Sequence, residues 1–283
     1  MFNGELIINA DDFGISPQTN RAIISSFNRG LVSSATIMAN GAAFEEACQL
    51  AHENGLVNRI GLHVNLFYGQ PLSERIKGCP RLCNADGKFD FKLKIGDRNW
   101  LPMSPVEKRA VYQEITEQIK LCRKYGLPVF HADSHHHQHN ELPIIPVMVH
   151  ALRSNQIPYI RPLRNMGAGI CVPKKCYKKI VNYRLRLCGM MAVDLFGDID
   201  DLAAHRHCLV KRRHYRIELM CHPKLDNMSR IVDLDGHSLP DKVKRIRSMY
   251  PNFITTYYAR LQKAVKHDIR ANLLKTTIKS VDV

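Results

Sequence analysis

The sequence lacks several features that define large classes of proteins. It has no run of about 18 apolar residues, the length needed to cross a membrane. Residues 1–10 do not show the basic region and long apolar segment of a secretory leader. The nine cysteines are scattered, without a CxxC pair that would indicate a structural zinc site or a redox motif. We therefore expect a soluble cytoplasmic protein with reduced thiols and no transmembrane segment.

Motifs for nucleotides and nucleic acids are also missing. The chain contains no P-loop, no GxGxxG motif, and no zinc-finger, RNP or helix-turn-helix pattern. No internal repeat is evident. The chain has 283 residues, of which 45% are hydrophobic, and this is enough to bury one full core. We therefore expect a single domain that spans residues 1–283.

Acidic residues are scarce in the second half of the chain. Residues 1–150 hold 15 Lys and Arg against 15 Asp and Glu, whereas residues 151–283 hold 26 against 11. The basic excess gathers in four segments, which are 174–186, 211–216, 242–247 and 260–279. Such segments suit an anionic partner, or they form a solvated surface with no partner. A basic nucleic-acid-binding protein is therefore one hypothesis, although without a recognition motif we expect no specific nucleic acid.

The densest polar stretch is His131–His139. It contains five of the fourteen histidines and one carboxylate. Imidazole is a good ligand for transition metals, and a nearby carboxylate often orients such a ring or completes the ligand set. The stretch follows the short apolar segment Leu127–Phe130, so we expect the histidines at the C-terminal end of a strand. In α/β barrels that end carries the chemistry, and the stretch thus predicts a metal site.

Two adjacent carboxylates follow another predicted strand. The apolar run Leu6–Ala10 leads into Asp11 and Asp12, which we expect at the strand's C-terminal end. Ser16-Pro17 then begins a helix, with the serine as N-cap. Because neighbouring carboxylates repel each other, such a pair indicates a bound cation or a catalytic task that gives the two different roles.

Two further histidines occur on predicted strands. In the strand 59–66, His63 and Asn65 alternate with apolar residues and share one face, which we expect to point into a barrel or cleft. The strand 216–221 delivers His222, which is followed by a proline. A lone histidine in a strand is usually a core residue, but these two belong to a set of polar clusters at strand ends.

The connecting segments complete the predicted α/β pattern. Residues 67–104 have weak periodicity and form a long loop, a lid or an excursion over the site. A capping box, Ser104 to Glu107, begins a helix that runs to about residue 125. A short strand, 157–160, ends at Arg161, which either braces a catalytic carboxylate or forms a surface ion pair. From about residue 253 we expect a basic helical tail.

Four motifs occur in one order along the chain: Asn9-Ala10-Asp11-Asp12-Phe13-Gly14, Gly61-Leu62-His63, His131-Ala132-Asp133-Ser134-His135-His136-His137-Gln138-His139 and Cys221-His222-Pro223. Together they resemble the YdjC-type carbohydrate deacetylases, which include chitooligosaccharide deacetylases. The resemblance covers residues 5–225 and implies a single-domain α/β fold, a distorted (β/α) barrel of the polysaccharide-deacetylase type. It also implies a hydrolase that removes acetyl groups from N-acetylated sugars.

The resemblance also implies roles for individual residues. Asp12, His63 and His135 match the positions that bind the metal, Asp11 matches the base and His222 the acid. His139 stands in HxxxH spacing with His135 and is a rival ligand. The match is weak over residues 165–213, the ending is basic where the family's is usually acidic, and Lys224 stands where many relatives have glycine. These departures leave the identity of the acyl sugar open, including whether it is phosphorylated or otherwise anionic.

The residue types alone support the same chemistry. A metal held by one carboxylate and two imidazoles can activate a water and polarise an amide carbonyl. A free carboxylate and a separate histidine can then remove and deliver protons. We expect one divalent ion, which is magnesium by resemblance, whereas the ligand set favours zinc, cobalt, nickel or iron. A homo-oligomer is left open.

Two other enzyme classes use similar residues. Two histidines and one carboxylate also form the iron site of non-haem oxygenases, but such an enzyme has no evident use for a second aspartate as a free base. A glycosidase that used Asp11 and Asp12 would need two carboxylates about 5–9.5 Å apart on either side of the scissile bond, rather than beside a metal.

Overall fold

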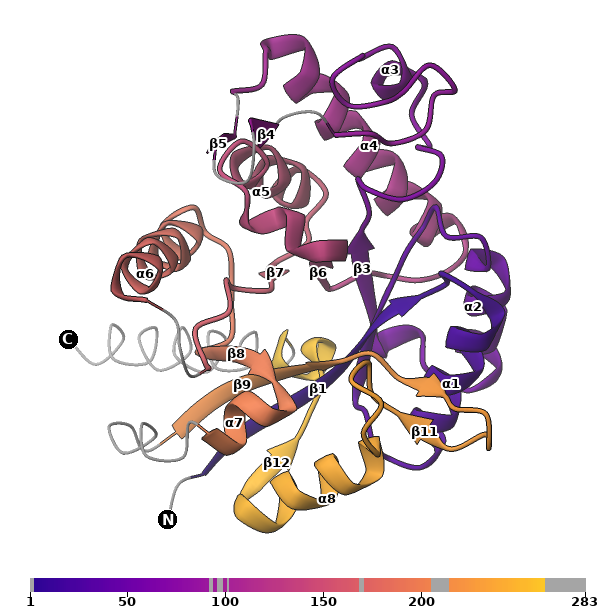
Figure 1. Cartoon of the computed structure of the whole chain (residues 1–283), viewed down its shortest axis with the longest axis vertical. Coiled ribbons are helices and arrows are strands. Elements are labelled where there is room, and N and C mark those ends of the chain that lie inside the picture. The colour runs from indigo at the N-terminus through magenta and orange to yellow at the C-terminus, as the bar shows by residue number, and fades with distance from the viewer. Residues whose placement is uncertain are drawn as a thin grey trace, which may run out of the picture.

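The core of the fold is a curled sheet of parallel strands (Figure 1). The computed structural model describes residues 3–91, 94–95, 99–100, 102–167, 171–204 and 214–262. The strand order is β7-β6-β3-β2-β1-β9-β8, and β12 pairs with β1 outside this path. The strands of this sheet are β1 (Asn3–Phe13), β2 (Ser34–Ile37), β3 (Ile60–Val64), β6 (His131–Ser134), β7 (Tyr159–Ile160), β8 (Leu195–Asp198), β9 (His214–Cys221) and β12 (Phe253–Thr255).

The sheet curls far enough to bring its two ends together. Every pairing within it is parallel. Met191, which precedes β8, forms a parallel bridge with Tyr159 of β7 at the other end of the strand order. The predicted α/β class and distorted barrel are thus confirmed. Because the strands are parallel, their carboxyl ends meet at one rim, where a site built from several strands can form.

Helices surround the sheet, as Figure 1 shows. Two of them begin as the sequence predicts: the Ser16 hydroxyl accepts the amide of Thr19, and Ser104 and Glu107 form the reciprocal capping box. Among the described residues no helix is both long and apolar enough to cross a membrane. The helices are α1 (Pro17–Asn28), α2 (Phe44–Glu53), α3 (Glu74–Lys77), α4 (Pro105–Lys124), α5 (Ile145–Ser154), α6 (Val172–Leu187), α7 (Ile199–Ala204) and α8 (Leu239–Met249), with 3-10 turns η1 (Val57–Arg59) and η2 (His135–Asn140).

Strand β1 separates the two sides of the core. Leu6, Ile8 and Ala10 belong to the large apolar cluster. Ile7 belongs instead to a smaller cluster with Tyr159, Phe196 and Tyr258 among others. Since side chains alternate along a strand, Asn9 and Asp11 continue the face of Ile7. That face therefore changes from apolar to polar toward the carboxyl end of the strand.

Two predicted strand boundaries were wrong by a few residues. β1 extends through Phe13, so the acidic pair lies within the strand rather than after it. β6 begins at His131, after the apolar segment Leu127–Phe130 that was expected to form the strand. The reason is the same in both cases: pairing with neighbouring strands continues into polar residues that periodicity alone assigns to a loop.

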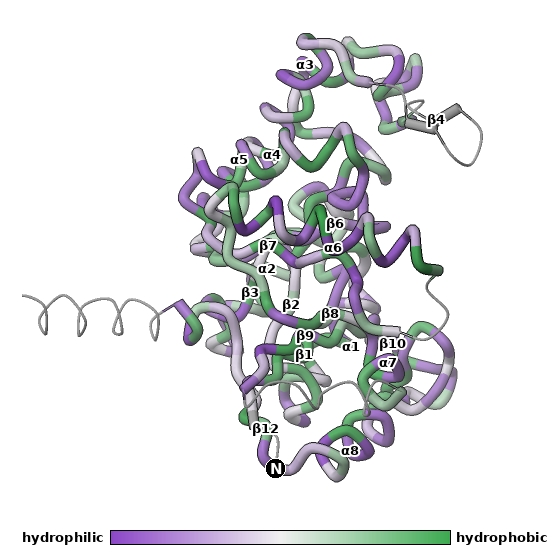
Figure 2. Tube along the Cα trace, turned by 90° about the vertical axis from the view of Figure 1, so that its left-hand side faces the viewer, coloured by the Kyte–Doolittle hydropathy of each residue, from purple (hydrophilic) through white to green (hydrophobic). Residues whose placement is uncertain are grey.

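The segment 67–104 packs to one side of the barrel. It contains α3 and the antiparallel pair β4 (Lys94–Ile95) and β5 (Asn99–Trp100). The buried Glu114 of α4 accepts the amides of Leu72 and Ser73, at 3.1 and 2.7 Å, and Figure 2 shows α3 at one end of the molecule. These bonds fix the base of the segment on α4, and its role as a lid stays a prediction.

The two regions that the sequence left least clear contain further elements. Residues 165–213 include α6, β8 and α7. A small antiparallel pair, β10 (Lys224–Leu225) and β11 (Ile231–Val232), follows His222. The predicted helical tail begins with strand β12, and a helical stretch at 258–262 follows it. The rest of that tail, 263–283, lies outside the described residues.

Candidate active site

The two carboxylates of the acidic pair point in different directions. The pairing of β1 with β2 shifts register between Ala10 and Phe13, and Asp12 lies in the left-handed region with φ 67°. A bulge of this kind re-aims a side chain and is common beside active sites. As a result Asp11 is buried inside the barrel, whereas the Asp12 side chain reaches the surface of a pocket.

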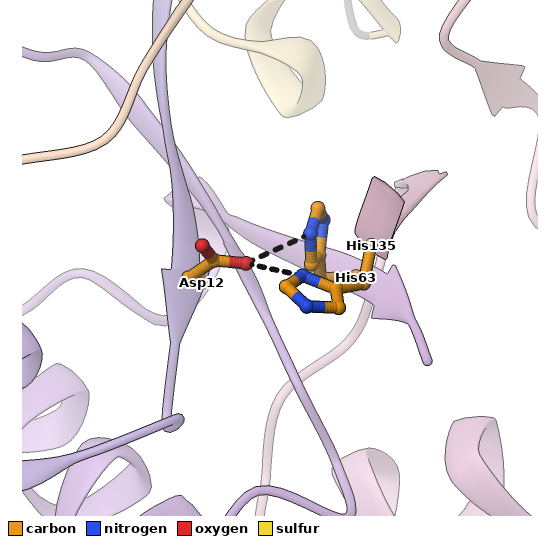
Figure 3. A group of neighbouring side chains, drawn as sticks. All are labelled: Asp12, His63 and His135. Atoms are coloured by element: carbon orange, nitrogen blue, oxygen red, sulfur yellow. Dashed lines mark hydrogen bonds and ion pairs between the residues drawn. The ribbon is translucent and has the colours of Figure 1, made fainter. Parts of the chain in front are cut away.

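Asp12 meets two histidines from other strands. Its Oδ1 atom lies 3.2 Å from His63 Nε2 and 2.8 Å from His135 Nδ1. Figure 3 shows both rings turned toward this one oxygen. Burial opposes ionisation of Asp12, but hydrogen bonds from His135 and His63 hold its pKa well below the usual value. One carboxylate and two imidazoles within 4.8 Å of one another form a set that could hold a metal ion.

A second carboxylate lies behind His63. Asp133 Oδ1 is 2.6 Å from His63 Nδ1, and Asp133 Oδ2 accepts the Thr36 hydroxyl at 3.1 Å. A carboxylate at Nδ1 assigns a proton to that nitrogen and leaves Nε2 facing Asp12. Burial lowers the pKa of His63, but Asp133 and Asp12 raise it to about 10. The surrounding carboxylates thus favour positive charge at this position, and a cation bound beside Nε2 would also supply that positive charge.

Arg161 places a permanent positive charge inside the barrel. Its Nη1 and Nη2 atoms lie 2.7 Å from the two oxygens of Asp11. Nη1 is also 2.6 Å from Asp133, and Nε is 2.7 Å from Glu218. Burial opposes ionisation of Asp11, but Arg161 keeps the pKa of that carboxyl below its usual value. Arg161 is thus buried and contacts three carboxylates rather than forming a surface ion pair, and its part in catalysis stays a prediction.

A second group of possible metal ligands overlaps the first. Asp11, His63 and Asp133 also lie within ligand distance of one another, and all three are buried. Arg161 already contacts both carboxylates of this group. The site therefore contains its own cation, and the group that includes Asp12 and His135 is the better candidate for a metal.

His222 lies near Asp11. Its Nε2 atom is 4.0 Å from Asp11 Oδ2. The His222 amide donates to Asp233 Oδ1 at 2.8 Å, and Lys242 Nζ lies 3.0 Å from the other oxygen of Asp233. The segment after β9 is thus fixed by a salt bridge from α8, and this holds His222 at the rim.

One pocket of about 730 Å³ is lined by Asp11, Asp12, His63, His135 and His222, together with other residues. It is bounded by the acidic pair, by five histidines and by several apolar and small polar side chains. The lining residues are Asp11, Asp12, Ile15, Ser16, Thr19, His63, Tyr68, Ser134, His135, His136, His137, Met220, His222, Pro223, Lys224 and Leu234. The described lining residues include Lys224 but no residue of α6, so the basic segment 174–186 does not form this pocket.

The histidines of the 131–139 stretch have different environments. His139 is 1% exposed, and its Nδ1 lies 2.6 Å from the Ser134 hydroxyl. It does not belong to the Asp12 group, so the structure favours His135 over this rival ligand. His136 packs on the Phe67 ring, with centroids 4.7 Å apart. His136 and His137 have φ values of 51° and 53°, and such strain costs about 1–3 kcal/mol per residue and clusters at functional sites.

Some functional positions were not identified from the sequence. Asp133 was noted only as a carboxylate within the histidine stretch, and Glu218 only as part of a strand. A usable signal did exist for Glu218, because it is the one charged residue between Ile217 and Cys221 in an otherwise apolar run. A charge in the middle of a buried strand requires a partner, although the sequence does not say which one.

Comparison with known proteins places the chain in a family. The family model described as YdjC-like protein matches residues 5–257. The chain is 31% identical to a carbohydrate deacetylase from Vibrio parahaemolyticus, over 77% of this chain and 78% of the relative. It is 30% identical to a carbohydrate deacetylase from Geobacillus stearothermophilus, over 77% and 78%.

A solved structure supports the same architecture. It comes from Enterococcus faecalis V583 and is provisionally described as a cellobiose-phosphate cleavage protein. It superposes with a TM-score of 0.66 and 23% identity, over 92% of this chain and 99% of the other. This likeness concerns the fold. From the family match, the identities and the site's geometry together, the chain belongs to the YdjC-like family.

Proposed function

We propose that this protein is a metal-dependent hydrolase that removes acetyl groups from N-acetylated sugars. The observation that carries the proposal is that Asp12, His63 and His135 converge at the pocket. Beside them lies a separate buried carboxylate, Asp11, which is paired with Arg161. The names of the relatives support a carbohydrate substrate and a deacetylation. The ligand set is shared with non-haem oxygenases, but the second carboxylate favours hydrolysis.

The donor atoms fit a single divalent ion. Asp12 Oδ1, His63 Nε2 and His135 Nδ1 would hold it, and two imidazoles favour zinc, iron, cobalt or nickel over magnesium, which prefers oxygen. When bound, the ion polarises the acetamide carbonyl and lowers the pKa of the attacking water. Asp133 holds His63 by Nδ1 and so keeps Nε2 free for this role.

Asp11 is the proposed general base. Arg161 keeps its pKa low, so the carboxylate is ionised at neutral pH and can accept a proton. The two-point contact with Arg161 and a bond from Asn9 Nδ2 to Oδ1, at 2.8 Å, orient it. A carboxylate with a low pKa is a weak base, so the contacts with Arg161 lower the basicity of Asp11 while they fix its orientation.

His222 is the proposed general acid. The water oxygen adds to the carbonyl carbon, the C–N bond breaks, and the amine leaves with a proton that His222 delivers. His222 lines the pocket with its Nε2 atom 4.0 Å from Asp11, so the two proposed proton-transfer groups are neighbours in the site. The products are acetate and a free amino sugar.

The pocket suits a sugar with a charged substituent. Tyr68 and Leu234 are exposed at its edge and offer apolar surface to a sugar ring. Lys224 is the one Lys or Arg among the described lining residues, and it could bind a phosphate or carboxylate on the substrate. We therefore expect anionic N-acetylated sugars to be better substrates than neutral ones.

An acetate-release screen tests the proposal. N-acetylated mono- and oligosaccharides, each with and without phosphate, are incubated with enzyme stripped by chelator and with enzyme to which single divalent metals are restored. We expect acetate only with metal. Oxygen consumption is followed in parallel. Acetate release by fully stripped enzyme would refute the metal role, and oxygen uptake without acetate would identify an oxygenase.

A further inference from the structure

Helix α6 stands at the periphery of the molecule (Figure 1). Figure 2 views the molecule from the side on which this helix lies. Only Val181 and Leu185 of α6 are buried, and Asn182 ties the helix to the backbone of Leu163 at 2.7 and 3.0 Å. Tyr177 and Lys178 are half-buried, and the Tyr177 hydroxyl donates to the Asn140 carbonyl at 2.9 Å. The opposite side of α6 is exposed.

An apolar stripe runs along the side of α6 opposite its buried residues. Val172, Ile180, Tyr183 and Leu187 are 72, 57, 63 and 67% exposed, and Cys176 is exposed as well. Successive members are four, four, three and four residues apart, which places them on one helical face. The buried Val181 and Leu185 lie about half a turn away. A globular protein gains nothing by exposing such a face to water.

Positive charge borders the stripe. Helix α6 contains four lysines and two arginines, and it contains no Asp or Glu. At 3.6 residues per turn, Lys175, Lys179 and Arg186 follow one edge of the stripe and Arg184 lies beyond the other. All four of these side chains are exposed. The surface therefore combines apolar contact area with cationic margins.

We propose that α6 docks the protein on a lipid bilayer with anionic headgroups. A helix with an apolar stripe and basic margins lies in the plane of the interface, where the apolar side chains enter the acyl boundary and the basic ones meet the headgroups. No described residue of α6 lines the 730 Å³ pocket, so the proposed docking face is separate from that pocket. The inference is independent of the proposed deacetylase chemistry.

Two other occupants fit the surface less well. Two copies that met along this stripe would bring their basic margins together, and like charges oppose such contact. A protein partner needs about 800 Å² on each side, and lysine is depleted in such interfaces. The stripe is a single helix face with lysines along it. Binding to a bilayer does not require a contact area of about 800 Å². The anionic headgroups also complement the basic residues beside the stripe.

Vesicle co-sedimentation of the full-length protein tests the proposal. The probes are vesicles of phosphatidylcholine alone and of phosphatidylcholine mixed equally with phosphatidylserine. We expect binding to the mixed vesicles only, and release as salt rises. Ile180→Ser with Leu187→Ser should lower partitioning by about tenfold or more, because each change removes methylenes that the proposed docking places in the acyl boundary of the bilayer. Lys175→Gln with Lys179→Gln should weaken binding and reduce its salt dependence.

Matched variants on other surfaces serve as controls. Val106→Ser with Ile254→Ser removes two side chains of similar exposure, and Lys108→Gln with Lys124→Gln removes two exposed charges from α4. Both controls should bind vesicles as the parent protein does. Failure of the parent protein to bind mixed vesicles at low salt would overturn the proposal, as would equal loss in the controls. A dimer in solution that the Ile180 and Leu187 changes dissociate would identify a self-association face instead.

Discussion

Asp133→Asn, compared with Glu218→Gln, tests whether Asp133 supports His63 as a metal ligand in addition to its contact with Arg161. The change keeps the side chain's shape but replaces one acceptor oxygen with an NH₂ group, which donates. In the native site Asp133 accepts from His63 Nδ1 at 2.6 Å, from Thr36 at 3.1 Å and from Arg161 at 2.6 Å. Asparagine cannot accept from all three. If its oxygen stays with Arg161 and Thr36, its NH₂ group faces His63 Nδ1, so the proton of His63 moves to Nε2 and blocks the proposed ligand atom.

The expected loss follows from the contact to His63. Changing a residue that supports a metal ligand typically costs 10- to 100-fold in metal affinity, or about 1.4–2.8 kcal/mol. Breaking a buried ion pair costs about 3–5 kcal/mol of stability when a charge is left alone. Arg161 keeps Asp11 and Glu218 in this variant, so the loss of unfolding free energy should fall below that range.

Glu218→Gln is the matched control. It also removes one carboxylate from Arg161, but Glu218 does not contact His63; its other partner is the Tyr258 hydroxyl. Metal affinity is measured by titration calorimetry against a competing chelator, and stability by urea unfolding of both proteins without metal. We expect similar destabilisation but a metal affinity that falls only in Asp133→Asn. Equal loss of affinity in the two variants would refute the direct role of Asp133 at His63.

Three other predictions concern residues that line the pocket or compete with its ligands. Asp12→Asn should lose metal and activity together, whereas Asp11→Asn should retain metal and lose about 10²-fold or more in kcat. Metal content and kcat are measured on the same preparations. If Asp11→Asn is metal-free and Asp12→Asn keeps its metal, then Asp11 is the metal ligand and Asp12 the base. His135→Ala should lower metal occupancy and His139→Ala should not, as elemental analysis of each folded variant will report. Lys224→Gln should raise KM for phosphorylated substrates and leave neutral ones unchanged, and an equal effect on both would remove Lys224 from substrate selection.

Local features of the fold could be read from the sequence. The capping box of Ser104 and Glu107 and the N-cap at Ser16 depend on residues within one helical turn. The inward direction of His63 depends only on the two-residue period of a strand. In each case the physical cause lies within a few residues of its effect.

The supporting network could not be read in this way. Arg161 lies 150 residues from Asp11 and 57 from Glu218, so their contact depends on the closure of the whole sheet. The sequence showed that Arg161 follows a strand and left open whether it is buried. The bulge at Asp12 likewise depends on how β1 pairs with β2. Curvature of the sheet and strand register, rather than local propensity, determine which of these polar groups meet.

The shape of Arg161 matters to the site as much as its charge. Its planar guanidinium contacts Asp11 through two nitrogens, Asp133 through one of these and Glu218 through the third. A lysine carries the same charge as a single point and could not span three carboxylates in these directions. Because one rigid group contacts both Asp11 and the support of His63, a shift of Arg161 would displace the proposed base and a proposed metal ligand together. The buried network therefore fixes the distance between the two halves of the site.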